Sequence, residues 1–488
     1  MSVSLKQQAI NGVFWSAVQK FGISLISFIS NIFLARLLTA DDYGCIGLLA
    51  IFIAVSNALV FGGFISALIQ KKDADEIDFS TVFYWNIVVS ILLYGVLYVA
   101  SPFIADYYSI EKLSIILRVQ GIILLINGLS AVQTTLLRKS LQFKKLAKIN
   151  LISALVSITV ALFLAYKGFG VWSLVVQQLV SSLCNTIILW ATSRWRPSLV
   201  FSFASFKGLF SYGCFLLLSD LMNTVCDNIQ GLIIGKRFSS SIMGYYTQAK
   251  RLEEVPTQSI SQLVAQVTFP IYARIQDSME KLRSAVKSTL ALMNYVNFPL
   301  MVMFIVIAKP LIVILYSEKW VSSIPYFQIL CVAGIVNCLQ SVNYQVVSAS
   351  GRSRQLFIWN FVKRGSGIVL IILGAFCGVK GILWGMVVSY YIIYFINAGL
   401  AYQSTHYSIL EQLIDSMPLL TISFVSGAIS YSFGYLIHSN GFLLIVQILV
   451  YLSSYILFSL LFKRKELYEI QTIIVHYFNR LSGTNKGQ

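Results

Sequence analysis

Charged and amide side chains recur at helical spacing inside segments that are otherwise apolar. Steps of three and four residues place them on one face of a helix. A charge at the centre of a bilayer costs about 2.5–3.5 kcal/mol, so such side chains normally face a partner or a polar interior. We predict that two such stripes line a central cavity, where Lys20 and Asp220 contribute opposite charges. The segment 12–37 carries Ser16, Lys20, Ser24, Ser27 and Asn31, and the segment 209–235 carries Asp220, Asn223, Thr224 and Asp227.

The segment 242–270 is the most polar of the expected helices. Its polar residues include Gln248, Lys250, Arg251 and Gln258, and Pro256 in its middle is expected to kink the helix. Such a helix cannot face lipid along its whole length, so we predict that it lines the same cavity. Simpler interpretations exist for both regions. Lys20 can snorkel to the membrane surface or form a structural ion pair, and Lys250 can pair with Glu254 at the outer interface.

Basic residues also gather where the expected helices leave the membrane on one side. Lys363 and Arg364 join Arg194, Arg196 and the cluster 138–148 there. Lys and Arg are the usual partners of phosphate groups, so this basic mouth is a candidate entry point for a phosphorylated head group. Interaction with anionic lipid is the alternative explanation.

The elements that must position these residues are membrane-spanning helices. Of the 488 residues, 57% are hydrophobic and 11% are charged, whereas soluble domains carry about 25% charged residues. The apolar runs are long enough to cross a bilayer, for which about 20 residues suffice. We predict an all-α integral membrane protein with fourteen transmembrane helices. They cover residues 12–37, 44–69, 80–104, 113–137, 149–166, 169–191, 209–235, 242–270, 285–308, 323–348, 355–377, 381–402, 417–437 and 441–462.

The basic residues behind the net charge of +17 are distributed as the expected membrane topology requires. With the N-terminus in the cytoplasm, about two thirds of the 36 Lys and Arg residues fall in segments on the cytoplasmic side. The positive-inside rule therefore predicts that both termini are cytoplasmic. A nucleic-acid-binding surface is disfavoured by the same distribution.

Signatures of enzymes and metal sites are missing from the sequence. The three histidines are far apart, and no two of the seven cysteines have C-x-x-C spacing, so we expect neither a metal site nor a disulfide framework. The stretch from Gly231 to Arg237 resembles a phosphate-binding loop, but its first gap is too short and Arg237 replaces Ser or Thr. The sequence also lacks a large extracytoplasmic loop, which is where a membrane polymerase often keeps its catalytic residues. We therefore expect a protein that is not an enzyme and needs no cofactor.

A weak repeat relates two parts of the chain at an offset of 200 residues. Residues 34–44 and 234–244 both place a basic residue eight positions before a glycine, Gly44 and Gly244, that opens the next helix. The repeat predicts two six-helix lobes, 1–200 and 201–405, related by an axis along the membrane normal. Two further transmembrane helices follow in 406–462, and 463–488 is expected to be a cytoplasmic tail.

Four short segments carry a resemblance to a known family. They are Gly12-Val-Phe-Trp15, Leu34 to Gly44, Met243-Gly-Tyr-Tyr246, and Phe269-Pro270 with Pro256 before it. These segments resemble bacterial polysaccharide transporters of the multidrug/oligosaccharidyl-lipid/polysaccharide flippase superfamily. The resemblance covers nearly the whole chain and points to the branch that exports colanic-acid, teichuronic-acid and related exopolysaccharide units.

This resemblance implies a monomer in the bacterial inner membrane whose central cavity opens alternately to the two sides. It implies transport of an undecaprenyl-pyrophosphate-linked oligosaccharide repeat unit from the cytoplasmic to the periplasmic leaflet, for exopolysaccharide biosynthesis. The matching candidates for contact with the pyrophosphate are Lys20, Lys250 and Arg251, while Asp220 and Asp227 are candidate sites for a coupling proton or sodium ion. Membrane lipids and polysaccharide assembly proteins are the expected partners. Two alternatives stay open: a cation-coupled drug antiporter of the same superfamily and a membrane polysaccharide polymerase.

Overall fold

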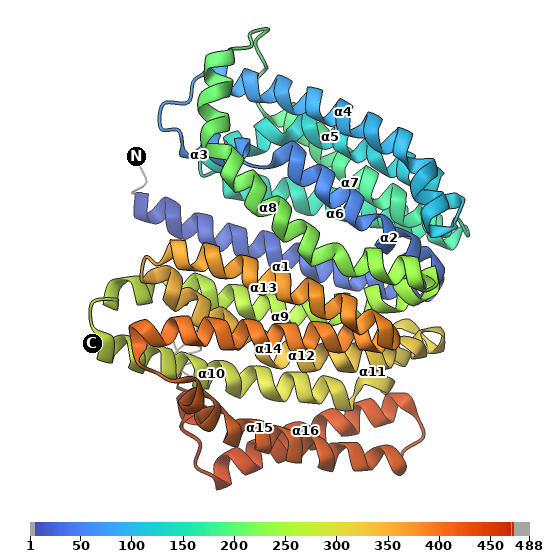
Figure 1. Ribbon diagram of the computed structural model, residues 1–488. Coiled ribbons are helices and arrows are strands. Elements are labelled where there is room, and N and C mark those ends of the chain that lie inside the picture. Colours follow the sequence, from blue (N-terminus) through green and yellow to red (C-terminus); the bar gives the residue numbers. More distant parts are fainter. Residues whose placement is uncertain (1–4, 470, 473–488) are drawn as a thin grey trace, which may run out of the picture. The chain divides into compact units, whose positions relative to one another are not determined.

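The protein is described by a computed structural model for residues 5–469 and 471–472 (Figure 1). Every regular element in this part of the chain is a helix, which confirms the predicted all-α class. Contacts within the chain divide it into two compact units, Met1–Thr247 and Gln248–Gln488. The lobes 1–200 and 201–405, predicted from the repeat, and the two-helix segment 406–462 stay predictions. Most of the predicted tail, 463–488, lies outside the described residues.

The first unit contains eight helices and the start of a ninth among its described residues. Within it α4 packs on α5, α6 on both α1 and α7, and α8 on α2 and α3. The helices are α1 (Leu5–Leu37), α2 (Ala40–Phe61), α3 (Phe64–Gln70), α4 (Glu76–Tyr108), α5 (Lys112–Lys139), α6 (Phe143–Tyr166), α7 (Val171–Thr192), α8 (Phe203–Arg237) and the first residues of α9 (Ser240–Ile275).

The second unit holds the rest of α9 and the later helices. Here α12 packs on α10 and α14, α13 on α14, and α15 on α10 and α16. The elements are α10 (Met279–Val306), α11 (Ala308–Tyr316), η1 (Glu318–Ser323), α12 (Ile324–Ala349), α13 (Ser353–Gly374), η2 (Ala375–Cys377), α14 (Gly378–Thr405), α15 (Ile409–Ser432), η3 (Phe433–Tyr435) and α16 (Asn440–Leu461).

Local sequence explains several of the helix boundaries. The Thr39 hydroxyl accepts a hydrogen bond from the backbone N–H of Asp42, and the Asp42 carboxylate accepts one from the backbone N–H of Thr39. This reciprocal capping box starts α2, and Asp75 and Asp78 form another at the start of α4. Gly63, between α2 and α3, has a φ of +80°, a left-handed backbone that favours glycine. Short polar motifs therefore set where the long apolar helices begin.

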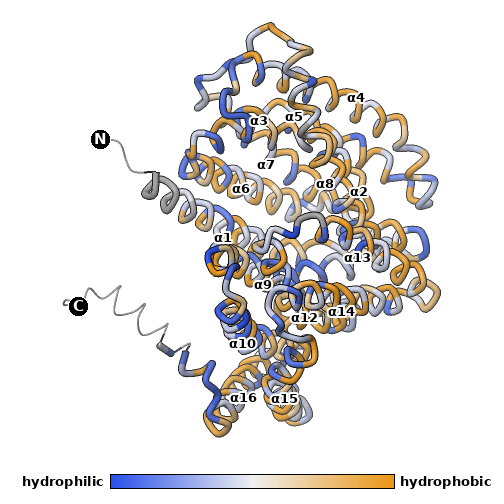
Figure 2. The backbone as a smooth tube through the Cα atoms, turned by 60° about the vertical axis from the view of Figure 1, so that its left-hand side comes forward, coloured by the Kyte–Doolittle hydropathy of each residue, from blue (hydrophilic) through white to orange (hydrophobic). Residues whose placement is uncertain are grey.

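The helices are long and apolar enough to form a multi-pass membrane protein. Eleven described stretches have the length and hydropathy of a membrane span, or twelve if the bent helix α8 is included. One of these stretches, Gln355–Thr405, contains both α13 and α14. Each of the fourteen predicted spans overlaps a helix, but their exact number stays a prediction. Hydrophobic residues run along most helices and hydrophilic ones gather at turns and helix ends (Figure 2).

Candidate functional site

Part of the predicted polar stripe on α1 lines a cavity in the first unit. The cavity has a volume of about 370 Å³. Its polar wall comes from Ser16, Gln19, Lys20 and Ser24 on α1 and from Arg138 in the last turn of α5. Ile23 and two residues of α6, Phe143 and Leu146, supply the apolar wall. The structure thus brings Lys20 together with a second cation from a distant part of the sequence.

Small residues on α1 explain why this stripe lies beside α6. A Cβ atom added to Gly12 would lie 2.8 Å from the Phe143 ring, and one added to Gly22 would lie 2.8 Å from the Leu151 side chain. Glycine lets two membrane helices approach this closely. The approach of α1 to α6 sets Lys20 and Ser24 beside Phe143 and Leu146, so the packing glycines position the polar residues.

The cavity has the chemistry of an anion site. Two cationic side chains, Lys20 and Arg138, line the same space and are both exposed. The guanidinium of an arginine can hold two phosphate oxygens at once, and lysine adds a compact positive charge. The hydroxyls of Ser16 and Ser24 and the amide of Gln19 can donate further hydrogen bonds to phosphate or sugar oxygens. A phosphorylated, sugar-bearing ligand fits this set of groups.

The rest of the α1 stripe has another role. Asn31 is buried, and the Tyr43 hydroxyl of α2 donates a hydrogen bond of 3.1 Å to its side-chain oxygen. Ser27 is exposed and is not part of the cavity wall. The predicted stripe therefore divides into a cavity-lining half, from Ser16 to Ser24, and a buried Asn31 that joins α1 to α2.

The polar stripe on α8 lies in the same unit, outside the lining of this cavity. Asp220 and Asp227 are exposed, while Asn223 and Thr224 are half-buried. The Thr224 hydroxyl donates to the backbone oxygen of Asp220 over 2.8 Å, as hydroxyls in membrane helices commonly do. The predicted role of this stripe in a substrate cavity, and the charge complement between Lys20 and Asp220, stay predictions.

The predicted stripe on α9 belongs to the second unit. Gln248 is buried, whereas Arg251 and Gln258 are exposed. The Lys250 ammonium lies 3.7 Å from the Glu254 carboxylate, which is the i,i+4 pair that the sequence offered as a simpler interpretation. A cavity-lining role for these residues is untested.

Lys363 is buried within the second unit. Its side chain is 4% exposed, and its ammonium donates a hydrogen bond of 2.5 Å to the side-chain oxygen of Asn397 on α14. Asn397 in turn donates to the backbone oxygen of Gln340 on α12 over 3.4 Å. Arg364 is half-buried. The predicted head-group entry at Lys363 and Arg364 stays a prediction, and the Lys363 ammonium contacts a neutral amide inside the unit.

Other basic residues of the expected cytoplasmic mouth neutralise helix C-termini. The Lys139 ammonium donates to the backbone oxygens of Leu68 and Lys71, over 3.0 and 2.6 Å. Lys145 donates to the backbone oxygen of Thr192 over 2.6 Å, at the end of α7. Cations at helix C-termini bind the free carbonyl groups and oppose the negative end of the helix dipole. Arg138 differs from these neighbours because it lines the cavity.

The two repeated junctions lie against each other in the first unit. A Cβ atom on Gly44 would overlap the backbone oxygen of Ser240, and a Cβ atom on Gly244 would overlap the backbone oxygen of Ala40. The Ser240 hydroxyl also donates to the Asp41 carboxylate, which pairs with Lys112. The contact is reciprocal, with each glycine meeting the backbone of the other junction. The two glycines that the repeat aligns therefore allow the starts of α2 and α9 to touch.

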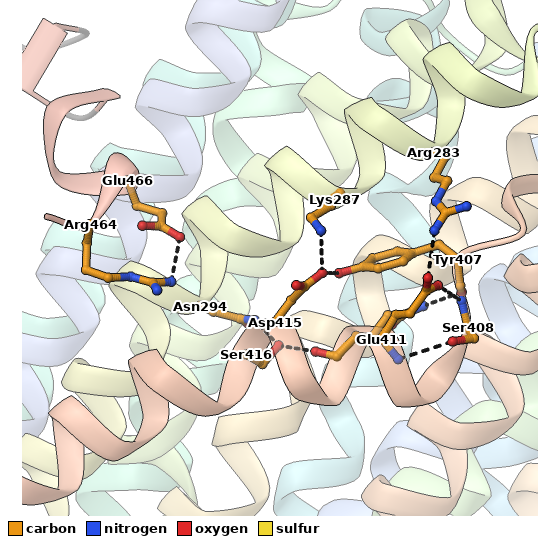
Figure 3. Close-up of polar contacts among 11 residues, drawn as sticks. Arg283, Lys287, Asn294, Tyr407, Ser408, Glu411, Asp415, Ser416, Arg464 and Glu466 are labelled. Atoms are coloured by element: carbon orange, nitrogen blue, oxygen red, sulfur yellow. Dashed lines mark hydrogen bonds and ion pairs between the residues drawn. The ribbon is translucent and has the colours of Figure 1, made fainter. Parts of the chain in front are cut away.

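A separate polar cluster joins α10 to α15 in the second unit (Figure 3). Arg283 pairs with Glu411 at 2.7 Å, and Lys287 pairs with Asp415 at 2.8 Å. The Tyr407 hydroxyl donates to Asp415 over 2.6 Å, and burial followed by this contact raises its pKa above the usual value for tyrosine. The groups in this cluster satisfy one another, so its role is to hold α15 against α10.

Sequence reasoning missed three residues that the structure singles out. Gln19 stands three residues after Ser16, so helical spacing alone could have added it to the stripe. The sequence placed Arg138 in the cytoplasmic mouth but did not predict that it lines the same cavity as Lys20, because 118 residues separate the two in the chain. Glu253 is buried, although Glu254 beside it is partly exposed. No signal in a single sequence tells which of several adjacent polar residues points inward.

The structure is similar to that of the lipid II flippase MurJ in an inward closed conformation, with a TM-score of 0.77 and 17% sequence identity, over 93% of this chain and 100% of that one. At this identity the likeness establishes the fold.

The chain belongs to the polysaccharide biosynthesis protein family, whose model matches residues 33–325. It is 29% identical to the teichuronic acid biosynthesis protein TuaB of Bacillus subtilis, over 75% of this chain and 76% of that protein. It is 24% identical to the lipopolysaccharide biosynthesis protein WzxC of Escherichia coli, over 88% of this chain and 89% of that protein. The family membership predicted from the short sequence segments is thus confirmed.

Proposed function

We propose that the protein flips a lipid-linked oligosaccharide across the membrane. The observation that carries this proposal is the cavity on α1, where Lys20 and Arg138 combine with hydroxyl and amide groups. Relatives named for teichuronic acid and lipopolysaccharide biosynthesis support an oligosaccharide cargo, and the MurJ-like fold supports a flippase. The cations suit the phosphate groups of the cargo, and the serine and glutamine side chains suit its sugar.

The finer features of this function are part of the same proposal. The cargo is an undecaprenyl-pyrophosphate-linked repeat unit, carried from the cytoplasmic to the periplasmic leaflet by alternating access, and the protein breaks no covalent bond. Both termini are cytoplasmic, and a monomer performs the transport. Lys250 and Arg251 on α9 are candidates for contact with the pyrophosphate, while Asp220 and Asp227 on α8 are candidates for a coupling proton or sodium ion. While the sugar and phosphates cross inside the protein, the lipid tail stays in the membrane.

The first experiment compares cells with and without the protein. Lipid-linked oligosaccharides are extracted after treatment of intact and opened cells with a membrane-impermeant glycan-modifying reagent, which reports their leaflet. We expect a completed repeat unit to accumulate on the cytoplasmic face when the protein is missing. An unchanged leaflet distribution with altered polymer length would instead indicate a polymerase. No change in either quantity, together with altered drug sensitivity, would indicate a drug antiporter.

A further inference from the structure

The second unit buries an acidic side chain that the cavity on α1 does not use. Glu253 on α9 is 8% exposed and stands three residues before Pro256. The Thr257 hydroxyl donates to its carboxylate oxygen Oε1 over 2.7 Å and to its backbone oxygen over 2.9 Å. Because proline has no N–H, the backbone oxygen of Leu252, the residue before Glu253, loses its helical donor. Glu253 therefore lies where α9 is locally weakened.

Neutral groups of α12 and α10 pack around this carboxyl. A Cβ atom on Gly334 would lie 2.9 Å from Glu253 Oε1 and 2.6 Å from the sulfur of Met301. The thiols of Cys331 and Cys338 are within electrostatic range of the carboxyl. Asn297 donates to the backbone oxygens of Gly334 and Ile335, over 3.1 and 2.9 Å. Its own side-chain oxygen is buried and has no hydrogen-bond donor in the described part of the structure.

The charged neighbours of Glu253 stand on its own helix. Lys250 and Glu254 pair with each other at 3.7 Å, and their side chains are 27% and 40% exposed. The titratable groups of α12 within electrostatic range are the two thiols. On α10, Met301 lies beside Gly334 and does not titrate. The Glu253 carboxyl thus lies against the Gly334 backbone, while Lys250 is engaged by Glu254 and Arg251 is exposed.

Two other buried carboxylates differ from Glu253 because each of them is paired with a cation. Asp78 is completely buried and pairs with Lys71 at 2.5 Å. Glu466 is 9% exposed and pairs with Arg464 at 3.0 Å. An ionised carboxylate is stable in the interior when a cation and hydrogen bonds compensate it. The donor to the Glu253 side chain is a neutral hydroxyl, which suits a carboxylic acid.

We propose that Glu253 is the binding site for a coupling proton, which it holds while α9 is packed against Gly334 and Met301. This inference rests on the proposed flippase function and assigns the proton to the second unit. Release transfers the proton from the carboxyl O–H to water and leaves a carboxylate. The charged form favours an arrangement of α9 in which the carboxylate reaches water, and Pro256 provides the weak point for that movement. Protonation and conformation are therefore linked.

The surroundings suit a proton better than a sodium ion. A hard cation requires several oxygen ligands. The groups that the structure places close to this carboxyl are the single hydroxyl of Thr257 and the Gly334 backbone, with the two thiols within electrostatic range. A proton needs one acceptor and a solvent-shielded position, and the site supplies both.

The first test is an infrared titration of the purified full-length protein in lipid vesicles. We expect a protonated carboxyl band near neutral pH in the wild type and in Glu254→Gln, and its loss in Glu253→Gln. Glu254 is a matched control because it stands beside Glu253 and is exposed. Absence of the band from the wild type would show that Glu253 is ionised. Its undiminished persistence in Glu253→Gln would assign the band to another carboxyl, and either result would overturn the proposal. Equal thermal unfolding of the two variants would show that both are folded.

The second test measures flipping of extracted lipid-linked oligosaccharide in the same vesicles, with and without an imposed pH gradient. We expect the gradient to accelerate the wild type and Glu254→Gln, and Glu253→Gln to lose this response. A response that survives in Glu253→Gln but is lost in Asp220→Asn would assign the coupling to α8. Acceleration by a sodium gradient alone would also overturn the proposal. No flipping by the wild type under any gradient would refute the proposed function, while the infrared titration would still decide the protonation of Glu253.

Discussion

The charged side chains that are candidates for function lie in different settings in the two units. In the first unit, Lys20 and Arg138 are exposed on the wall of a cavity. In the second unit, Glu253 and Lys363 are buried and accept from or donate to neutral partners, Thr257 and Asn397. An exposed cation keeps its charge for a ligand, whereas a buried group depends on its protonation state and on one local partner. The first arrangement suits cargo binding, and the second suits a conformational response of the protein to protonation.

Removal of both cavity cations should produce the largest effect and tests the first half of this comparison. Charged hydrogen bonds contribute about 1.5–3 kcal/mol each, so Lys20→Ala with Arg138→Ala should slow flipping by roughly 100-fold or more. Flipping is measured by the leaflet assay in cells that express each variant at equal level. Lys148→Ala is the matched control, since Lys148 is an exposed cation of the same basic cluster that does not line the cavity. A double variant that flips at the wild-type rate would remove the cargo role of the cavity.

Methyl groups at the repeat junctions test whether the first unit depends on close glycine contacts. The neighbours of Gly44 and Gly244 are backbone oxygens that cannot rotate away, so Gly44→Ala and Gly244→Ala should each lower the free energy of unfolding by about 3 kcal/mol. Thermal unfolding in detergent measures the change. A Cβ atom on Gly95 meets nothing within 4 Å, so Gly95→Ala is the control and should not destabilise. Unequal effects at the two junctions would contradict their reciprocal packing.

Replacement of the buried Lys363 tests the second half of this comparison. Lys363→Met keeps much of the side-chain volume but leaves the Asn397 oxygen without its ammonium donor, which should cost about 1–2 kcal/mol in unfolding free energy. The exposed Lys380 on α14 provides the control variant Lys380→Met, which should change stability little. If Lys363 acts instead as a head-group entry, Lys363→Met will slow flipping without loss of stability.

The ion pairs between α10 and α15 should give the smallest effect. Both members of the Arg283–Glu411 pair are 44% exposed, so water screens their attraction, Arg283→Ala should lower the unfolding free energy only slightly, and added salt should reduce the difference. Thermal unfolding at low and high ionic strength measures both quantities. A loss as large as that expected for the glycine variants would mean that this cluster, and not apolar packing, holds α15 in place.

The elements of the fold were accessible from the sequence because their signals are local. Apolar runs and caps such as Thr39 with Asp42 depend on residues a few positions apart. The repeat, which aligns Gly44 with Gly244, also needed only pattern, and the structure shows these two glycines in the same contact region. The membership of the polysaccharide biosynthesis family followed from equally short segments.

The candidate site was accessible only in part. Helical spacing put Lys20 and Ser24 on one face, and both line the cavity. The same spacing included Asn31, which is buried against Tyr43. Periodicity identifies a face of a helix, but the neighbour of each point on that face is contributed by another part of the chain.

The sequence by itself determined an all-helical membrane protein of this family. Hydropathy and helix caps depend on residues that are close together in the chain, and the repeat is visible from pattern alone. Only the tertiary structure decided that Arg138 joins Lys20, that Lys363 reaches Asn397 and that Glu253 lies against Gly334. Each of these arrangements brings together residues from different helices. The burial and charge environment of a side chain depend on the helices packed around it, and a pattern along one helix does not contain that information.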